Sequence, residues 1–371
     1  MTVSVVRALG LVARRAAHAA DPVPDPLADL ARCRACGHTE TVLAERGEGV
    51  VVRHGKAVAK AHADGTDLAG HRARLAVAAH PRLAGILLPP LPPLPPSLPL
   101  PADAGTDAGT ARTLETAGTV HGRPVTAWPY GSPVDPADPD GAPWEQAGTL
   151  VARLHSVPLE TVRAAVRTAG GTAGGLPPMR GPAKAARAVA RMRAAGPHPA
   201  AGLVLRAWER LPAWARDEAP APGPGALCHG DLHLGQLVRH PAPDGPWLLI
   251  DVDDLGIGDP AWDLARPAAW YAAGLLPPEI WQRFLGAYRT ARGPAVPTTA
   301  GLDPGPDPAA YPDPWPRLDV PARALTVQTA ALAIAKSVAE NRDPDEVEQL
   351  MIDACGRIAS LPPELEPPRS S

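Results

Sequence analysis

Short apolar runs around a glycine predict a β-hairpin in the first third of the chain. Within residues 41–62, Val50-Val51-Val52 and Ala57-Val58-Ala59 flank His54-Gly55-Lys56. Such runs on either side of a glycine are typical of two strands joined by a tight turn. Residues 120–131 return to the same character around His121-Gly122-Arg123. This part of the chain is therefore expected to be rich in strands.

Helical spacing follows this region. From Trp144 onwards, apolar residues recur every three or four positions, which places them on one face of a helix. They are Ala147, Leu150, Val151 and Leu154. The helix should end at residues 155–158, because a proline disfavours helical backbone in the residue before it. Residues 160–215 are rich in Ala and Arg, which predicts further helices joined by loops.

A last helix is predicted near the C-terminal end. Asp343 is its candidate N-cap, Pro344 fits the first turn, and Asp345-Glu346 supplies acids near the helix start. One apolar stripe at helical spacing should pack on the rest of this region. The stripe consists of Val347, Leu350, Met351, Ala354 and Ile358.

Other segments favour neither element. Residues 87–101 alternate Leu and Pro, so they should run extended. Residues 293–316 form a long loop rich in Pro, Gly and Asp, which is typical of a binding loop or of disorder. The first twenty residues carry arginines and no acid, without the apolar core of a secretion signal. We expect residues 1–30 and 361–371 to be disordered.

The residues with the clearest chemistry lie between positions 229 and 263. The loop His229-Gly230-Asp231-Leu232-His233-Leu234-Gly235-Gln236 follows the apolar residues Ala226-Leu227-Cys228. The apolar run 247–250 is followed directly by Asp251. Such a run predicts a short buried strand with a carboxylate at its end. A charge at the end of a strand can face a cleft.

Phosphoryl transfer needs what this segment offers. It requires a carboxylate that orients and deprotonates the acceptor, oxygen ligands for Mg²⁺ and a cation on the phosphates. Asp231 can supply the carboxylate, and the oxygens of Gln236 and Asp251 suit a metal that takes few protein ligands. We therefore predict transfer of the γ-phosphate of ATP to a hydroxyl, with an amine as the second choice.

These motifs resemble those of the aminoglycoside phosphotransferase and choline kinase group within the protein-kinase-like superfamily. The resemblance covers roughly residues 40–290 and is sharpest at 227–265. It implies that Asp231 is the catalytic base and that Asp251 corresponds to the metal-binding Asp of the Asp-Phe-Gly element. Gln236 stands where the group has a loop Asn, and would be a magnesium ligand. The Gln form of the loop is similar to that of bacterial maltokinases.

The same resemblance assigns supporting residues. Asp259 and Asp263 match acids that brace the loop and cap the next helix, and His229 opens the loop. His155 is expected to be structural, and His233 to face the loop surface rather than the chemistry.

The phosphate cation is sought among only four lysines, Lys56, Lys60, Lys184 and Lys336. Lys60 ends Val58-Ala59-Lys60, which is similar to the Val-Ala-Ile-Lys strand of kinases. The resemblance therefore implies that Lys60 binds the α- and β-phosphates of ATP. The alternative is a surface lysine on an edge strand.

Two kinase features are weak in this sequence. Gly47-Glu48-Gly49 is a poor match to a glycine-rich phosphate loop. Between residues 61 and 80, where kinases carry the Glu that pairs with the lysine, the only acids are Asp64 and Asp67. Either Asp67 or an acid placed elsewhere would have to substitute for that Glu.

The segment Trp128-Pro129-Tyr130-Gly131 resembles the link between the lobes, where backbone groups can meet adenine. Trp128 and Tyr130 are therefore candidates for nucleotide binding. An ordinary aromatic turn is the alternative.

Composition limits the partners. The 371 residues suit two lobes, and the net charge is −3. Residues 225–371 hold 20 acids and 11 bases, and the remainder holds 25 bases and 19 acids. No strongly basic face for nucleic acid is indicated. No run of eighteen apolar residues is present, so we expect no membrane helix and a cytoplasmic enzyme.

The cysteines do not define a metal site by spacing alone. Cys33 and Cys36 are spaced as in a zinc knuckle, but a structural zinc needs four ligands and no second pair follows. Cys228 and Cys355 are isolated. We expect reduced thiols, and the role of Cys33 and Cys36 stays open.

Together these features predict an α+β protein with a protein-kinase-like two-lobed fold. A small β-rich nucleotide-binding lobe would span residues 31–131, and a larger, mainly helical lobe for catalysis and acceptor binding would span 132–360. The expected cofactors are ATP and Mg²⁺. An aminoglycoside, a sugar or an amino alcohol would be the acceptor. The alternatives are a nucleotide-binding protein without turnover and, third, a protein kinase. The sequence does not indicate an oligomeric state.

Overall fold

The computed structural model describes residues 2–19, 33, 36–46, 49–92, 118–168, 175–297 and 312–361. The chain forms two compact units. Unit 1 consists of Met1–Pro133, Ala165–Gly175 and Val238–Ile250. Unit 2 consists of Val134–Ala164, Leu176–Leu237 and Asp251–Ser371. The expected boundary was residue 131, whereas the first segment of unit 1 ends at Pro133 and two later segments join that unit.

An antiparallel sheet of five strands is the centre of unit 1, in the order β1-β2-β3-β5-β4. Its strands are β1 (Glu40–Arg46), β2 (Gly49–His54), β3 (Ala57–Ala61), β4 (Thr119–Val120) and β5 (Arg123–Pro129). The hairpin predicted at 41–62 is confirmed, because Val52 pairs with Ala59 across a turn at Gly55. Gly55 has φ +54°, a conformation that glycine adopts without strain.

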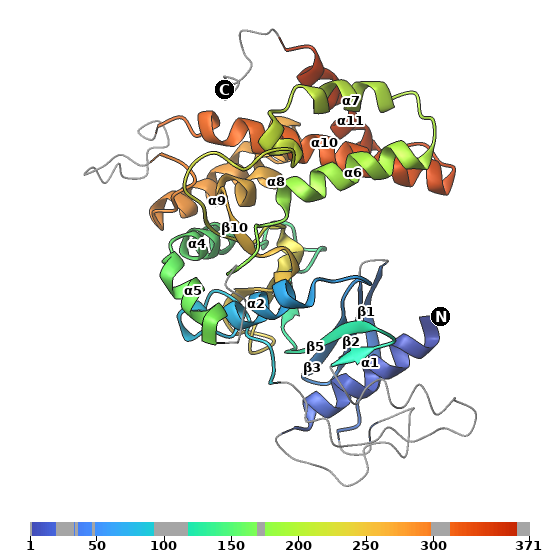
Figure 1. Cartoon of the computed structure of the whole chain (residues 1–371), viewed down its shortest axis with the longest axis vertical. Helices are drawn as coiled ribbons and strands as arrows, with labels where there is room; N and C mark the ends of the chain where they lie inside the picture. Colours follow the sequence, from blue (N-terminus) through green and yellow to red (C-terminus); the bar gives the residue numbers. More distant parts are fainter. Residues whose placement is uncertain are drawn as a thin grey trace. The chain divides into compact units, whose positions relative to one another are not determined.

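Helix α1 (Thr2–Ala17) lies along this sheet (Figure 1). Val5, Leu9 and Ala13 recur every four residues and are buried against β2 and β3. The expectation that residues 1–30 are disordered is therefore wrong for residues 2–17. This apolar stripe holds the helix against the sheet. Residues 20–32 lie outside the described residues.

The rest of unit 1 includes α2 (Leu68–Ala78) and the short helix η1 (Pro81–Leu83). A second sheet holds β6 (Ser132–Pro133), β8 (Leu237–Arg239) and β9 (Trp247–Leu249). The strand predicted at 247–250 is thus confirmed. Residues 88–92 contain no helix or strand, as expected, and Leu87 bridges to Leu249. The rest of the predicted extended segment, 93–101, lies outside the described residues.

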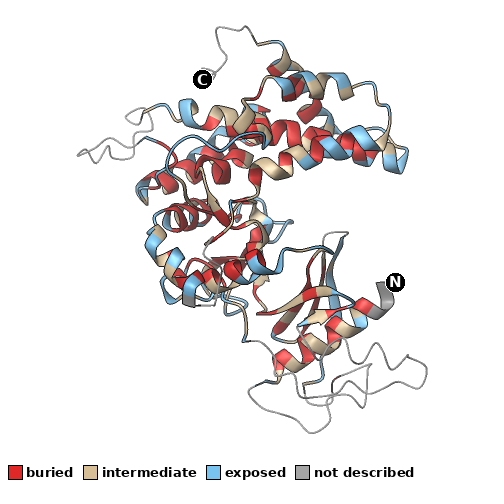
Figure 2. Ribbon diagram, viewed as in Figure 1, coloured by how far each residue is buried: buried red, intermediate tan, exposed pale blue. Residues whose placement is uncertain are grey.

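Unit 2 is mainly helical. Its helices are α4 (Trp144–His155), α5 (Leu159–Thr168), which ends in unit 1, α6 (Gly181–Ala195), α7 (Ala201–Glu209), α8 (Ala261–Ala272), α9 (Pro278–Thr290), α10 (Trp315–Glu340) and α11 (Glu346–Ala359). Helix α10 packs against α6, α8 and α11, and α4 packs against α9. Figure 2 shows the buried residues along α8 and α10. The predicted α4 has the expected end and buries its apolar stripe.

The start of α11 differs from the prediction. Its N-cap is Asp345 rather than Asp343, because Asp345 and Glu348 form a reciprocal capping box. The carboxylate of Asp345 accepts from the Glu348 N–H at 2.9 Å, and Glu348 accepts from the Asp345 N–H at 2.9 Å. The buried face also differs from the prediction, since Val347 is 55% exposed and Ile352 is buried.

The loop predicted at 293–316 is described only at its two ends, since residues 298–311 lie outside the described residues. The same holds for 362–371. Among the residues that the structure does describe, none of the helices has the length and apolarity needed to cross a membrane.

Candidate active site

The two chemical motifs of the sequence meet in unit 2. Strand β7 (Ala226–Cys228) pairs antiparallel with β10 (Gly256–Gly258), with Cys228 opposite Gly256. The loop 229–236 follows β7, and the short helix η4 (Val252–Asp254) precedes β10. The loop and η4 come close together at Gly230, which has φ +83°. A side chain at this position would clash with the carbonyl oxygen of Asp254. Glycine is therefore required at this position.

Asp231 lies between two cations. Its Oδ2 is 2.8 Å from Lys184 Nζ on α6, and its Oδ1 accepts from Arg266 Nη2 on α8 at 2.9 Å. Lys184 Nζ also donates to Asp254 Oδ2 at 2.8 Å. The ammonium of Lys184 thus links the loop after β7 to the segment before β10.

These neighbours fix the charge of Asp231. Burial by itself would raise the pKa of its carboxyl, but the cations of Lys184 and Arg266 outweigh this and hold the pKa well below its usual range. Burial would likewise lower the pKa of Lys184, yet Asp254 and Asp231 raise it on balance. Both groups are therefore charged at neutral pH. Such an Asp231 is suited to orient an acceptor hydroxyl more than to act as a strong base.

Asp263 holds the backbone of the loop in place. Its carboxylate accepts from the N–H groups of His229 and Gly230, at 2.6 and 2.8 Å. It also accepts from His155 Nε2 at 2.9 Å, and His155 Nδ1 lies 2.8 Å from the Tyr288 hydroxyl. Burial would raise the pKa of Asp263, but the hydrogen bond from His155, assisted by the His229 backbone, lowers it on balance. The loop is thus tied to the buried core of unit 2.

The other acids predicted for this site also lie in unit 2. Asp259 Oδ1 accepts from the N–H of Ala261, the first residue of α8, at 3.0 Å, and lies 3.3 Å from Arg317 Nη2. Asp251 is in the left-handed region at φ +62°, and its Oδ1 accepts from the Asp253 N–H at 3.4 Å. Gln236 ends the short helix η3 (Leu234–Gln236) and is buried.

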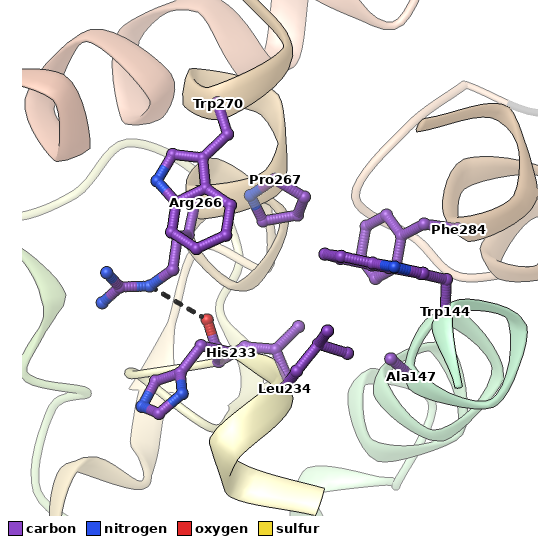
Figure 3. Close-up of a pocket in the computed structure, with 9 residues that line it drawn as sticks. Trp144, Ala147, His233, Leu234, Arg266, Pro267, Trp270 and Phe284 are labelled. Carbon is purple, nitrogen blue, oxygen red and sulfur yellow. Dashed lines mark hydrogen bonds between the residues drawn. The ribbon is translucent and has the colours of Figure 1, made fainter. Parts of the chain in front are cut away.

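A pocket lies beside the loop, and we call it the aromatic pocket. Its lining residues are Trp144, Ala147, Leu232, His233, Leu234, Arg266, Pro267, Trp270 and Phe284 (Figure 3). Trp144 and Phe284 contact each other edge to face at 6.2 Å. None of these nine described residues is acidic. A second pocket, lined by Asp231 and Lys184 among others, shares Leu232 and Arg266 with it. The aromatic pocket therefore borders the residues around Asp231.

His233 was expected to face the loop surface, but it lines the aromatic pocket. Its Nδ1 accepts from the Gly235 N–H at 3.1 Å, which shapes the start of η3. Burial lowers the pKa of His233 to about 4, so its ring is neutral at pH 7.

The candidate nucleotide residues lie in unit 1. Lys60 is on β3, where it pairs with Val51 and Thr126 on the neighbouring strands. Trp128 is buried, and its Nε1 donates to Thr126 Oγ1 at 2.9 Å. Whether Lys60 reaches the same phosphates as the residues of unit 2 stays a prediction.

Both backbone polar groups of Tyr130 have partners inside unit 1. Its N–H donates to the Lys56 carbonyl at 2.8 Å, and its carbonyl oxygen lies 3.0 Å from His240 Nδ1. The Arg53 guanidinium stacks over its ring, 3.4 Å from the ring centre. If this segment contacts adenine, it would therefore do so through groups other than the backbone N–H and carbonyl of Tyr130.

The two acids considered as partners for Lys60 have other contacts. Asp67 caps α2, accepting from the N–H groups of Ala69 and Gly70 at 3.0 and 3.1 Å. Asp64 lies 3.6 Å from Arg123 Nε. Asp67 therefore has a structural role of its own. Gly47 and Glu48 of the weak glycine loop lie outside the described residues.

Sequence reasoning missed Lys184, Arg266 and Asp254 as parts of the site. The only available signal was the rarity of lysine, since Lys184 is one of four. Its distance from the loop along the chain concealed the contact with Asp231.

Comparisons with known proteins bear on the family and the fold of this chain. Residues 98–304, more than half of the chain, match the model of the phosphotransferase enzyme family. No curated protein matches. The apo form of a thermostable mutant of an aminoglycoside phosphotransferase is similar in fold, with 15% identity, 88% of this chain and 97% of that chain covered, and a TM-score of 0.50. This likeness agrees with the protein-kinase-like fold expected from the sequence.

Two further solved structures also match. One is a choline/ethanolamine kinase family protein from Mesorhizobium loti, with 16% identity, 90% and 93% coverage of the two chains and a TM-score of 0.46. The other is a spectinomycin phosphotransferase in complex with ADP and spectinomycin, with 14% identity, 87% and 92% coverage and a TM-score of 0.49. The family match spans the loop of Asp231, Asp251 and the helices that hold them, and it establishes that this chain belongs to the phosphotransferase enzyme family.

Proposed function

We propose that this protein transfers the γ-phosphate of ATP to a hydroxyl group of a small molecule. The observation that carries the proposal is the setting of Asp231. Its carboxylate is ionised, its loop is fixed by Asp263, and it lines a small pocket that shares Leu232 and Arg266 with the aromatic pocket. Phosphoryl transfer depends mainly on positioning and on electrostatic stabilisation, and this arrangement provides both.

Asp231 would accept a hydrogen bond from the acceptor hydroxyl and take up its proton as the new P–O bond forms. Lys184 and Arg266 lie within 3 Å of the same carboxylate. Cations at this place can stabilise negative charge on the transferred group. Asp254 keeps Lys184 oriented through its own ion pair. An amine acceptor would use the same carboxylate and is the second choice.

Mg²⁺ fits the donors that the chain offers. Asp251 supplies a carboxylate and Gln236 an amide oxygen, and hard oxygen ligands of this kind suit a magnesium ion that keeps several waters. The ion would neutralise charge on the β- and γ-phosphates. Lys60 would bind the α- and β-phosphates, with Trp128 and Tyr130 near the base. ATP as the donor implies a cytoplasmic enzyme.

The aromatic pocket indicates the acceptor class. It offers ring faces and a guanidinium but no carboxylate among its described lining. A polycationic aminoglycoside or a choline-like cation would find no carboxylate in this lining, where the guanidinium of Arg266 is already paired with Asp231. A neutral hydroxylated compound with an apolar face, such as a sugar ring, fits better because it can stack on Trp144 or Trp270.

A second candidate function is nucleotide binding without turnover. The specific observation in its favour is that both oxygens of Asp231 already have cationic partners, Lys184 and Arg266. If these pairs persist when ATP is bound, the carboxylate cannot orient an acceptor. A protein kinase is the third candidate.

ADP release separates these functions. Purified protein with Mg²⁺ and ATP would be offered neutral glycosides, aminoglycosides, amino alcohols and a generic protein substrate, with Asp231→Asn as the control. Release that depends on a glycoside and is lost in the control supports the proposal. Binding of ATP without release on any acceptor favours the silent protein, and release only with the protein substrate favours a protein kinase.

A further inference from the structure

Four side chains with metal-binding atoms meet at the C-terminal end of α1. They are His18, Cys33, Cys36 and His54, and their ligand atoms all lie within 4.8 Å of one another. Cys33 Sγ is 3.5 Å from His18 Nε2, and Cys36 Sγ is 3.3 Å from His54 Nε2. Cys33 and His54 are buried, at 2% and 0% exposure. All four belong to unit 1, whereas the residues around Asp231 belong to unit 2.

The separations suit one tetrahedral ion. With Zn–S of about 2.3 Å and Zn–N of about 2.05 Å, a tetrahedral zinc holds its sulfur and nitrogen ligands about 3.6 Å apart. The two sulfur–nitrogen distances given above are close to this value. Two thiolates and two imidazoles are also a ligand set that zinc uses in structural sites.

The backbone around the cysteines forms a closed turn. The Gly37 N–H donates to the Cys33 carbonyl at 2.6 Å, and the Cys33 N–H donates to the His38 carbonyl at 2.9 Å. Gly37 has φ +68°, which permits the chain to reverse. This turn brings Cys33 and Cys36 together, as the C-x-x-C half of a zinc site requires.

The second ring nitrogen of His54 faces a carboxylate. His54 Nδ1 lies 3.3 Å from Glu40 Oε1, which in turn accepts from Arg14 Nη2 at 2.8 Å. Histidines that bind metals usually donate their other N–H to an acceptor, which fixes the ring and its tautomer. Glu40 is the nearest acceptor for this role, although Nδ1 forms no hydrogen bond in the structure, and Nε2 is left for the metal.

We propose that His18, Cys33, Cys36 and His54 form a structural Zn²⁺ site. On binding, the thiols of Cys33 and Cys36 each release a proton, and two thiolates with two neutral imidazoles give a site without net charge, which suits its burial. The ion joins the end of α1, the cysteine turn and the end of β2. It fixes the N-terminal helix to the sheet and takes no part in phosphate transfer.

The sequence concealed this site because its ligands do not come as two adjacent pairs. One histidine lies before the cysteines and the other follows the second strand of the sheet. Only pairing of β2 with its neighbours and packing of α1 bring them to the cysteine turn.

Metal analysis of the purified full chain tests the proposal. The wild type is expected to hold one equivalent of zinc, and the Cys33→Ser/Cys36→Ser variant to hold none. Two matched controls should keep the metal. Cys355→Ser removes a buried thiol of unit 2, and His38→Ala removes a histidine of the same turn that is not among the four ligands.

Cobalt substitution provides a test that does not depend on the serine variant folding. Co²⁺ in the wild type should give the intense visible bands of a tetrahedral site and a thiolate-to-cobalt charge-transfer band. Cys36→His should keep cobalt with a weaker charge-transfer band. If the wild type holds no zinc and gives no cobalt spectrum, the proposal is overturned. The cluster would then be two S–H···N hydrogen bonds, Cys33 with His18 and Cys36 with His54. Zinc retained in the double serine variant, or lost in His38→Ala, would overturn the assigned ligands.

Discussion

At the scale of single residues, the proposed reaction depends on the charge of Asp231. A carboxyl with a depressed pKa is a weak base, so its value to the reaction lies in position. Phosphoryl transfer tolerates this, because its catalysis depends mainly on positioning and electrostatic stabilisation. Lys184 and Arg266 therefore have two effects. They keep Asp231 ionised, and in the proposed reaction they would place positive charge near the transferred phosphoryl group.

Replacing Lys184 should change the pH dependence of the reaction. Because its pKa lies well below the usual range, Asp231 stays ionised in the wild type as the pH falls through the ordinary range of an aspartate. In Lys184→Met the carboxyl loses one cation, its pKa rises, and the acid side of the kcat/KM profile should move to higher pH. Profiles measured from pH 4 to 9 check this. Lys336→Met, which removes an exposed lysine of α10, is the matched control. An unshifted acid limb in Lys184→Met would contradict the role given to this ion pair.

Trp270 should contribute to acceptor binding. It lines the aromatic pocket and is half-buried, so its loss should leave the fold intact. Removal of one stacking contact costs about 1 kcal/mol, and Trp270→Ala should raise the KM of the acceptor about fivefold with the KM of ATP unchanged. Steady-state kinetics with each substrate varied decides the point. Trp247→Ala, in unit 1, should change neither value, and equal effects of the two variants would argue against the pocket.

At the scale of elements, the ends of helices depend on particular hydrogen bonds. The capping box of α11 satisfies two backbone donors at once, and its partner Glu348 also binds Arg342 at 2.6 and 2.8 Å. The side-chain bond from Arg342 lowers the pKa of Glu348 to about 2, so this carboxylate is charged throughout the neutral range.

Asp345→Ala should destabilise the protein by about 1 kcal/mol, because the N-cap bond to the Glu348 N–H is lost. Asp343→Ala, two positions earlier, should have little effect on unfolding. Chemical denaturation of the two variants checks the assigned cap. Equal losses at the two positions, or the larger loss at Asp343, would restore the cap that the sequence alone indicated.

The elements also show which features a sequence can reveal. Local patterns sufficed for α4 and for the β2–β3 hairpin, because spacing and turn residues specify them directly. Helix α1 was missed because its stripe of Val5, Leu9 and Ala13 is short and interrupted by arginines, and its partner is a sheet formed later in the chain. The aspartates of the loop were visible as a motif. Lys184 was not, since only the packing of α6 brings it to Asp231.

At the scale of the whole molecule, the chain is a member of the phosphotransferase enzyme family with a protein-kinase-like fold. Its two units divide the proposed work. Unit 1 carries the lysine and aromatic residues expected at the nucleotide, and unit 2 carries Asp231, the metal-ligand candidates and the aromatic pocket. Each unit has its own way of fixing key residues, through Asp263 in unit 2 and through the proposed zinc ligands in unit 1.

Nucleotide binding should depend on Lys60. ATP with Mg²⁺ should raise the thermal unfolding temperature of the wild type, since a ligand that binds only the folded state stabilises it. Lys60→Ala should weaken the binding of ATP about tenfold, which corresponds to about 1.4 kcal/mol of binding free energy. Thermal shift and calorimetry measure both effects. Lys56→Ala, on the exposed turn between β2 and β3, is the matched control, and an unchanged affinity in Lys60→Ala would remove this lysine from the phosphate site.

The most direct test of the central claim is to identify the product. An acceptor found in the ADP-release screen would be incubated with ATP and Mg²⁺, and the product analysed by mass spectrometry and phosphorus NMR for wild type and Asp231→Asn. We expect a phosphate ester on one acceptor hydroxyl, formed about 10² to 10⁴ times more slowly by the variant. Equal rates of ester formation by the two proteins would contradict the role of Asp231 and the account built on it.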